Sequence, residues 1–265
     1  MYSFFKIAGK YLNYYVSASN GKGHGMHSPF VFNFITRILN DEGHYPEYDK
    51  VEELRHALLK DHQPLQIDDM GAGSTSSNAA HRTVASLAKR AAKPRKFGQL
   101  LYRMVKTFQP RTVVELGTSL GISTAYLSLG NPTAKVITIE GSKEIASKAR
   151  KNFQRLGLGN VSSVIGNFDD TLGHLIEPLS TVDLCFIDGN HRLEPTLRYF
   201  HQLLPKMNNE SILIFDDIHW SEEMEAAWEK VREHPKVRCT IDLFFIGIVF
   251  FREEFREKRE FVVRF

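Results

Sequence analysis

Between residues 97 and 251, short apolar segments alternate with amphipathic ones, and this alternation limits the possible folds more than any other feature of the chain. The apolar segments have the length of strands and are nearly continuous, as expected where helices cover both faces of a parallel sheet. Seven strands are predicted, at Thr112–Leu116, Val136–Ile139, Val161–Ile165, Leu184–Ile187, Ile212–Phe215, Val237–Leu243 and Ile246–Phe251. The last two lie too close together for a helical crossover, so we expect them to be antiparallel neighbours.

Helices are predicted at Gln99–Phe108, Ser123–Leu129, Lys143–Leu156, Leu172–Glu177, Leu193–Leu204 and Glu222–Glu233. The expected fold class is α/β: a Rossmann-like, doubly wound, mostly parallel seven-stranded sheet with an antiparallel last strand. Residues 1–96 lack repeated strand signals and show helical spacing at Phe30–Leu39, Val51–Leu59 and Ala79–Ala92. We therefore expect a helical N-terminal appendage or lid over 1–96 and a catalytic domain with a C-terminal tail over 97–265.

The composition is that of a globular protein, since 42% of the 265 residues are apolar and 25% are charged. The formal net charge is only +3, which argues against a dedicated nucleic-acid binder. Only two cysteines are present, so a disulfide framework is not expected. A cytoplasmic location is expected instead. No stretch approaches the roughly 20 apolar residues of a membrane span, and no membrane partner is expected.

A glycine-containing turn follows the first strand of the alternating region. The strand ends near Glu115, and Gly117 and Gly121 precede the helix that begins near Ser123. Glycine permits a tight turn and a close approach of a ligand to the backbone. Nucleotide-like ligands bind where the carboxyl end of a strand meets a helix N-terminus, although ordinary strand–helix turns look similar.

Polar side chains at the ends of the next two strands support a nucleotide-like ligand. Glu140 ends the second strand, about 25 residues after Glu115, and an acid at that position accepts hydrogen bonds from ribose hydroxyls. Asn167 follows the third strand, where its side chain would reach an adenine edge with Phe168 beside the ring. The loop is not Gly-x-Gly-x-x-Gly, which disfavours a dinucleotide dehydrogenase.

These segments resemble a known enzyme group. Gly98-Gln99-Leu100-Leu101, followed by Val-Val-Glu-Leu-Gly-Thr-Ser-Leu-Gly-Ile-Ser-Thr over 113–124, is similar to the start of the catechol and caffeoyl-CoA O-methyltransferases, which are class I S-adenosylmethionine (SAM) dependent enzymes. The resemblance covers roughly residues 97–251 and implies SAM as cofactor. The residues then expected at the cofactor are Glu115, Gly117, Thr118, Ser119, Gly121, Ser123, Glu140, Gly141, Asn167, Phe168 and Asp188. The group more often has Asp where Asn167 stands, but an amide oxygen also accepts a hydrogen bond.

Three carboxylates are expected to meet at the carboxyl edge of the sheet. Asp188 ends the fourth strand, and Asp216 and Asp217 end the fifth. Such a cluster repels itself unless a divalent cation binds, and Mg²⁺ is the usual choice for oxygen ligands. Asp216 and Asp217 would point to opposite faces if the strand continued, so both are ligands only if the chain turns there. The alternative is that Asp188 holds the SAM amino group without a metal.

His191 lies three residues after Asp188, where the catechol-type group has a Lys as general base. The Asp-Gly-x-His pattern from Asp188 to His191 resembles the pattern that the macrolide-sugar O-methyltransferases carry at this point. A neutral imidazole accepts a proton near neutral pH, so His191 and Asp188 are the predicted catalytic residues. The competing interpretation is that His191 caps the following helix. His219 is either a second base or a loop histidine packed by Trp220, and we favour the loop histidine.

The predicted function is O-methylation of a small hydroxylated acceptor, with metal assistance from Asp188, Asp216 and Asp217. Two alternatives stay open: N-methylation of RNA or protein, suggested by the basic residues between Lys89 and Lys96, and a non-catalytic SAM-binding role. A homodimer is compatible with the sequence.

The segment from Asp68 to Ser74 resembles an acid-then-glycine loop but lacks a following strand, and a flap or plain loop is expected there. The segment from His24 to Phe30 has the glycine and proline content of a lid.

Overall fold

The computed structural model describes residues 1–19, 21–23, 27–65, 82–91 and 94–265. Its internal contacts divide the chain into two units, one formed by residues 1–41 and 172–265 and the other by residues 42–171. The first is called the C-terminal unit here and the second the central unit. The segment from Asp68 to Ser74, His24 and Lys93 lie outside the described residues. The predicted division into 1–96 and 97–265 stays a prediction.

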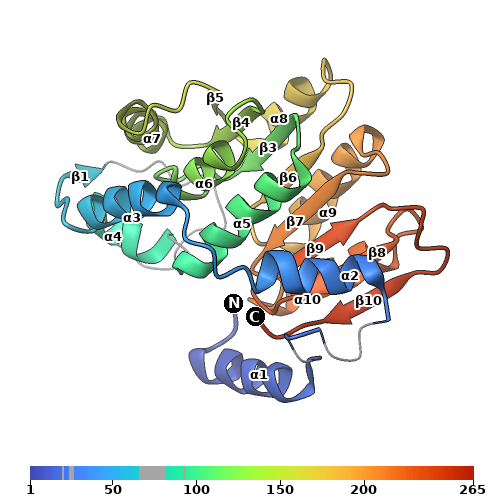
Figure 1. Cartoon of the computed structure of the whole chain (residues 1–265). Coiled ribbons are helices and arrows are strands. Elements are labelled where there is room, and N and C mark those ends of the chain that lie inside the picture. Colours follow the sequence, from blue (N-terminus) through green and yellow to red (C-terminus); the bar gives the residue numbers. More distant parts are fainter. Residues whose placement is uncertain (20, 24–26, 66–81, 92–93) are drawn as a thin grey trace. The chain divides into compact units, whose positions relative to one another are not determined.

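The central unit combines three parallel strands with helices (Figure 1). Strand β3 (Thr112–Leu116) pairs with β4 (Lys135–Glu140), which pairs with β5 (Val161–Ile165). The helices are α3 (Pro46–Leu59), α4 (Val84–Ala91), α5 (Arg95–Phe108), α6 (Ile122–Gly130) and α7 (Lys143–Arg155). Two short strands, β1 (Pro64–Leu65) and β2 (Arg82–Thr83), pair antiparallel. Helix α8 (Phe168–Ile176) follows β5 and crosses the sequence boundary between the units.

A tyrosine-rich core packs α3, α5 and α6 together in the central unit. The rings of Tyr48 and Tyr102 lie 5.1 Å apart, and those of Tyr48 and Tyr126 lie 5.9 Å apart. The hydroxyls of two of these rings are bonded to carboxylates, because Tyr102 donates to Glu47 and Tyr126 donates to Glu52. Gly98 makes the close packing of α5 on α6 possible, since a Cβ there would lie 2.4 Å from the Tyr126 ring.

The C-terminal unit contains five strands in the order β10-β8-β9-β7-β6. They are β6 (Leu184–Ile187), β7 (Ile212–Asp216), β8 (Cys239–Asp242), β9 (Ile246–Phe250) and β10 (Arg259–Val262). Strand β7 is parallel to β6, whereas β9 runs antiparallel to both β7 and β8. The helical elements are α1 (Phe4–Ser17), α2 (Pro29–Phe34), the π-helix η1 (Ile35–Leu39), α9 (Leu193–Leu203), the 3₁₀ turn η2 (Leu204–Lys206) and α10 (Glu222–Glu233).

Local sequence signals explain where α10 begins and ends. The Ser221 side chain accepts a hydrogen bond from the Met224 amide, which satisfies an otherwise free donor of the first turn. Glu222 and Glu223 lie in that turn and Lys230 and Arg232 in the last, so both ends complement the helix dipole. Trp228 and Val231 are buried on the inward face.

The structure confirms an α/β fold with mostly parallel strands and corrects the expected strand count. Apart from β1 and β2, the described residues form eight strands rather than seven. The antiparallel strand is β9, but the last strand along the chain is β10, which runs parallel to β8. Strand β10 lies in the segment that was expected only as a C-terminal tail. None of the helices in the described ranges is long and apolar enough to cross a membrane.

Candidate functional site

The turn between β3 and α6 has the backbone that the glycine pattern predicts. Gly117 and Gly121 have φ values of 107° and 83°, and the intervening Ser119 has a φ of 47°. A Cβ at Gly121 would lie 2.4 Å from Cε1 of Phe153, so glycine is required there by both space and conformation. The Gly117 and Thr118 amides both donate to the Ile139 carbonyl, which ties the turn to the end of β4.

Glu115 is fully buried at the end of β3. Its Oε2 accepts hydrogen bonds from the hydroxyls of Thr124 and Thr138, the latter at 2.6 Å. Burial raises the pKa of Glu115 to about 7, against the opposing effect of these hydroxyl donors. The Thr118 hydroxyl lies 2.6 Å from that of Thr138, so its side chain belongs to this buried polar group. Among the expected cofactor residues, Glu115 and Thr118 therefore have a clear internal structural role.

Glu140 lies at the end of β4, beside the same turn. Its Oε2 accepts from the Ser119 amide at 2.8 Å, and its Oε1 accepts from the Ser142 amide at 3.1 Å. Burial raises the pKa of Glu140, and the backbone amides oppose that shift. Each carboxylate oxygen has a second lone pair, so the group still has capacity for ribose hydroxyls.

The remaining expected cofactor residues of the central unit lie at or near the same strand ends. The buried Ser119 hydroxyl has no hydrogen-bond partner within the described part of the chain. Asn167 precedes α8, and its side-chain oxygen accepts from the Asp169 amide at 3.1 Å. Asn167 and Phe168 are half-buried, as are Ser123 and Gly141. The partnerless hydroxyl and the glycine backbone provide what a polar, nucleotide-like cofactor needs, so these residues fit SAM.

A group of potential metal ligands lies in the C-terminal unit. Ligand atoms of Asp188, His191 and Asp216 all lie within 4.8 Å of one another. Nε2 of His191 is 3.6 Å from Oδ1 of Asp188, which is an ion-pair distance rather than a short hydrogen bond. Asp216 is almost fully buried, whereas Asp188 and His191 are half-buried. Two carboxylates and one imidazole form a donor set that fits a divalent cation.

The chain turns at Asp217. Such a turn is needed if Asp216 and Asp217 are both to act as ligands. Asp217 has a φ of 54°, its amide donates to the Phe245 carbonyl, and its own carbonyl accepts from the Trp220 amide. The three-residue group above contains His191 and not Asp217. The role of Asp217 as a ligand stays a prediction.

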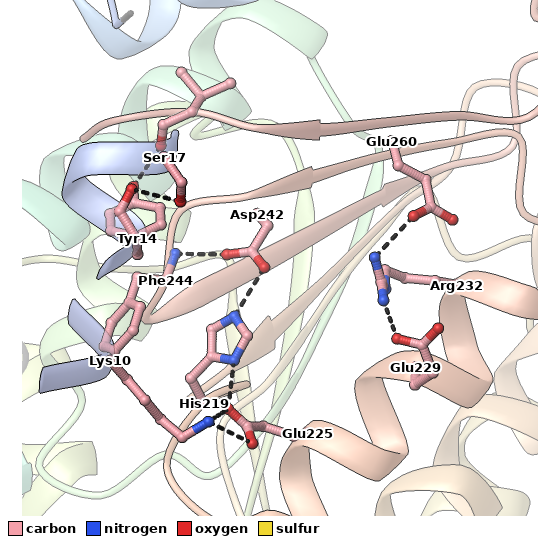
Figure 2. Close-up of polar contacts among 11 residues, drawn as sticks. Lys10, Tyr14, Ser17, His219, Glu225, Glu229, Arg232, Asp242, Phe244 and Glu260 are labelled. Atoms are coloured by element: carbon pink, nitrogen blue, oxygen red, sulfur yellow. Dashed lines mark hydrogen bonds and ion pairs between the residues drawn. The ribbon is translucent and has the colours of Figure 1, made fainter. Parts of the chain in front are cut away.

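His219 occupies a polar network that sequence reasoning missed (Figure 2). Its Nδ1 lies 3.0 Å from Oε1 of Glu225 and its Nε2 lies 2.8 Å from Oδ2 of Asp242. Burial acts to lower the pKa of His219, but the hydrogen bonds and charges of Asp242 and Glu225 outweigh it and raise that pKa. The ring also stacks on Phe244 at 5.1 Å. His219 therefore fixes the turn after β7 to α10 and to the end of β8.

No local sequence signal could have found this network. Asp242 is 23 residues from His219 in the chain, and pairing of β7 with β9 and of β9 with β8 brings the two together. The stacking of the ring on Phe244 likewise brings together residues that are 25 positions apart in the chain.

Part of the chain is similar in sequence to known proteins. Residues 114–218 match the profile of a family described as "Methyltransferase domain". The chain is 32% identical over 123 residues to a catechol O-methyltransferase of Mycobacterium tuberculosis, which covers 46% of this chain and 54% of that protein. It is 29% identical over 124 residues to a catechol O-methyltransferase of Niastella koreensis, covering 46% and 55%. The chain thus spans about half the length of the curated relatives it matches.

Solved structures show the same fold. The SAH-bound methyltransferase PaMTH1 of Podospora anserina has a TM-score of 0.59 at 15% identity, covering 85% of this chain and 97% of that one. An O-methyltransferase of Bacillus cereus in complex with SAH has a TM-score of 0.56 at 20% identity, covering 83% and 97%. Residues 114–218 thus match the methyltransferase domain family, and over about half of its length the chain is similar to catechol O-methyltransferases.

Proposed function

We propose that the chain transfers the methyl group of SAM to a hydroxyl of a small acceptor, assisted by a divalent cation. The observation that carries the proposal is the close group of Asp188, His191 and Asp216 in a methyltransferase domain. Curated relatives named as catechol O-methyltransferases support a hydroxylated small molecule as the acceptor.

The central unit supplies the residues that we assign to SAM. When bound, SAM supplies a methyl group activated by a positively charged sulfur. The turn from Gly117 to Gly121 offers backbone close to the ligand, and Glu140 accepts from the ribose hydroxyls. Asn167 faces the adenine edge. Each residue binds and orients the cofactor, and such positioning accounts for much of the rate enhancement of a two-substrate reaction.

The C-terminal unit supplies the residues that we assign to the acceptor. Asp188 and Asp216 would hold the cation, with Asp217 as an additional ligand. A bound divalent cation lowers the pKa of a hydroxyl that coordinates it and so favours loss of its proton. The imidazole of His191 would accept that proton. Asp188 Oδ1, 3.6 Å from Nε2 of His191, would then stabilise the positive charge of the protonated ring. His191 is also close enough to be a ligand itself, and the two roles are separable by experiment.

Replacing His191 with Ala tests both the function and the role of the histidine. We expect the H191A variant to lose at least about a hundredfold in turnover, because general-base catalysis contributes on the order of 10²–10⁴. Turnover is measured as SAH release with catechol and with a panel of hydroxylated aromatic and sugar acceptors. Titration calorimetry with SAM and with Mn²⁺ should give affinities unchanged from the wild type.

Two variants serve as comparisons for H191A. His174→Ala changes an exposed histidine of α8 and should leave turnover and both affinities unchanged. Asp216→Asn should weaken Mn²⁺ binding and leave SAM binding intact. Loss of Mn²⁺ binding in H191A would make His191 a ligand instead of the base. Full turnover in H191A would contradict both roles.

The same assay distinguishes the proposed function from its rival, which is methylation of nitrogen in RNA or protein. Exposed basic residues at Lys89, Arg90 and Arg95 motivate that rival. It predicts activity on bulk RNA or on a protein extract that persists when EDTA removes divalent cations. The proposed function predicts activity on small acceptors that EDTA abolishes and Mg²⁺ or Mn²⁺ restores. SAM binding without transfer to any acceptor would favour a non-catalytic role.

A further inference from the structure

Helix α1 is anchored to the C-terminal unit by one of its faces. Tyr11 and Tyr14 pack their rings 5.1 Å and 5.3 Å from the ring of Phe244, and Ile7 joins the same cluster. The Tyr14 hydroxyl donates to the Val263 carbonyl, next to β10. These contacts involve one side of the helix only.

Polar contacts fix the same side of α1 (Figure 2). Lys10 Nζ lies 2.9 Å from Oε1 of Glu225, and the Tyr2 hydroxyl donates to Oε2 of Glu225 at 2.7 Å. The Tyr2 amide also donates to the Trp220 carbonyl. Helix α1 is therefore held in a defined orientation, and its opposite face is presented to the outside.

The outward face of α1 is apolar. Six of the ten large hydrophobic side chains that are exposed in the described residues lie within the first 16 positions: Met1, Phe4, Phe5, Leu12, Tyr15 and Val16. The exposed fractions of Phe4, Phe5 and Val16 are 79%, 84% and 71%. With about 100° per residue, Phe4, Tyr15, Leu12, Phe5 and Val16 fall within an arc of about 120° that contains no charged side chain. Such clustering marks an interaction surface.

Cationic side chains lie beside this face. Residues 1–40 contain no Asp or Glu, and their cationic side chains are Lys6, Lys10, Lys22 and Arg37. Lys6 is exposed, and the Arg264 guanidinium lies 5.1 Å from the centroid of the Tyr15 ring. Lys10 is engaged by Glu225 on the anchored side. A partner that complements both properties has an apolar interior and a negatively charged surface.

A second copy of the chain is disfavoured by charge. Two such faces packed together would bring like charges close to each other.

We propose that the outward face of α1 binds the surface of an anionic phospholipid bilayer, with the helix lying in the plane of the interface. Phe4, Phe5, Leu12 and Val16 would enter the region between headgroups and acyl chains, and Lys6 would contact the acidic headgroups. At about 21 Å the helix is shorter than the roughly 30 Å hydrocarbon core, so this mode needs no span. No membrane partner was expected from the sequence, because none of its apolar segments is long enough to span a bilayer. The inference goes beyond the proposed function and does not depend on it.

Co-sedimentation of the full chain with vesicles tests the proposal. We expect the wild type to bind vesicles of equimolar phosphatidylcholine and phosphatidylserine, and to bind phosphatidylcholine alone much more weakly. Phe5→Gln combined with Val16→Gln should lower the apparent affinity at least about tenfold, because apolar area no longer leaves water. Raising the salt concentration should also weaken binding, since ions screen the attraction to headgroups.

A matched variant and a fold check complete the experiment. Phe32→Gln combined with Leu59→Gln removes two exposed apolar side chains elsewhere and should bind vesicles as the wild type does. Circular dichroism verifies that each variant is folded, and Phe4→Gln with Leu12→Gln provides a second change on the same face. The proposal is overturned if the wild type ignores phosphatidylserine vesicles or if both α1 variants bind equally well. It is also overturned if light scattering finds a wild-type dimer that the α1 variants lose, because the face would then join two copies.

Discussion

Glu115 shows at the residue scale what it costs to keep a carboxyl group away from water. It is completely buried, and two threonine hydroxyls donate to one of its oxygens. Burial raises the pKa of Glu115 from 4.5 to about 7 despite these donors. The folded protein therefore holds a proton on Glu115 over a pH range in which the unfolded chain has lost it.

This shift predicts a pH-dependent stability. A raised pKa contributes stability that is fully present below the unfolded value of 4.5 and is lost as the pH rises through about 7. The difference corresponds to about 3 kcal/mol, as an order of magnitude. Urea unfolding of the SAM-free protein at about pH 5 and about pH 8 measures it.

Glu115→Gln provides the comparison, because an amide does not titrate. The wild type should lose stability relative to E115Q between the two pH values, while titration of all other groups cancels in the difference. If the wild type and E115Q differ in free energy of unfolding by the same amount at both pH values, the raised pKa of Glu115 is contradicted.

The turn from β3 into α6 is the element whose geometry the sequence specifies most strictly. Gly121 adopts a positive φ and also lies against the Phe153 ring of α7. A side chain here would therefore meet two obstacles, one conformational and one steric. The turn is held between α6 and α7, which explains its defined backbone.

Gly121→Ala should lower the free energy of unfolding by about 2 to 4 kcal/mol, from backbone strain and from overpacking against Phe153. Gly157→Ala separates the two causes, because Gly157 has a φ of 68° with nothing within 4 Å of a Cβ. It should cost only about 1 to 2 kcal/mol. Chemical denaturation of both variants measures the losses, and equal losses would show that the Phe153 contact is unimportant.

Elements with a clear period were predictable, and those without one were not. Strands β3, β5 and β6 begin and end at the predicted residues, because charged, polar or glycine residues flank each of them. Helix α1 was missed because it is apolar on two faces and shows no single stripe. Strand β10 was missed because it is charged and mostly exposed, and only pairing with β8 makes it a strand.

For the whole molecule, the proposed cofactor site predicts stabilisation by SAM. A ligand that binds only the folded protein adds about 2.7 kcal/mol at a hundredfold excess over its dissociation constant. For a chain of this size, that should raise the unfolding temperature by about 5 to 10 °C. Thermal unfolding with and without SAM measures the shift.

Glu140→Ala is the variant that ties the shift to the proposed site. At the same SAM concentration its shift should be smaller than that of the wild type, each measured against its own SAM-free midpoint. Glu53→Ala, which removes an exposed carboxylate, should behave as the wild type. An unchanged midpoint of the wild type in SAM would contradict the cofactor assignment.

The sequence by itself determined the α/β class, most element boundaries and the residues that end β3, β4, β6 and β7. These follow from local properties: apolar runs, helical spacing, and glycine or acid at strand ends. Only the tertiary structure decided that Asp188, His191 and Asp216 lie within 4.8 Å of one another, that His219 is held by Asp242 and Glu225, and that one face of α1 stays exposed. Each of these depends on strand pairing or helix packing between distant segments, and no local pattern encodes such contacts.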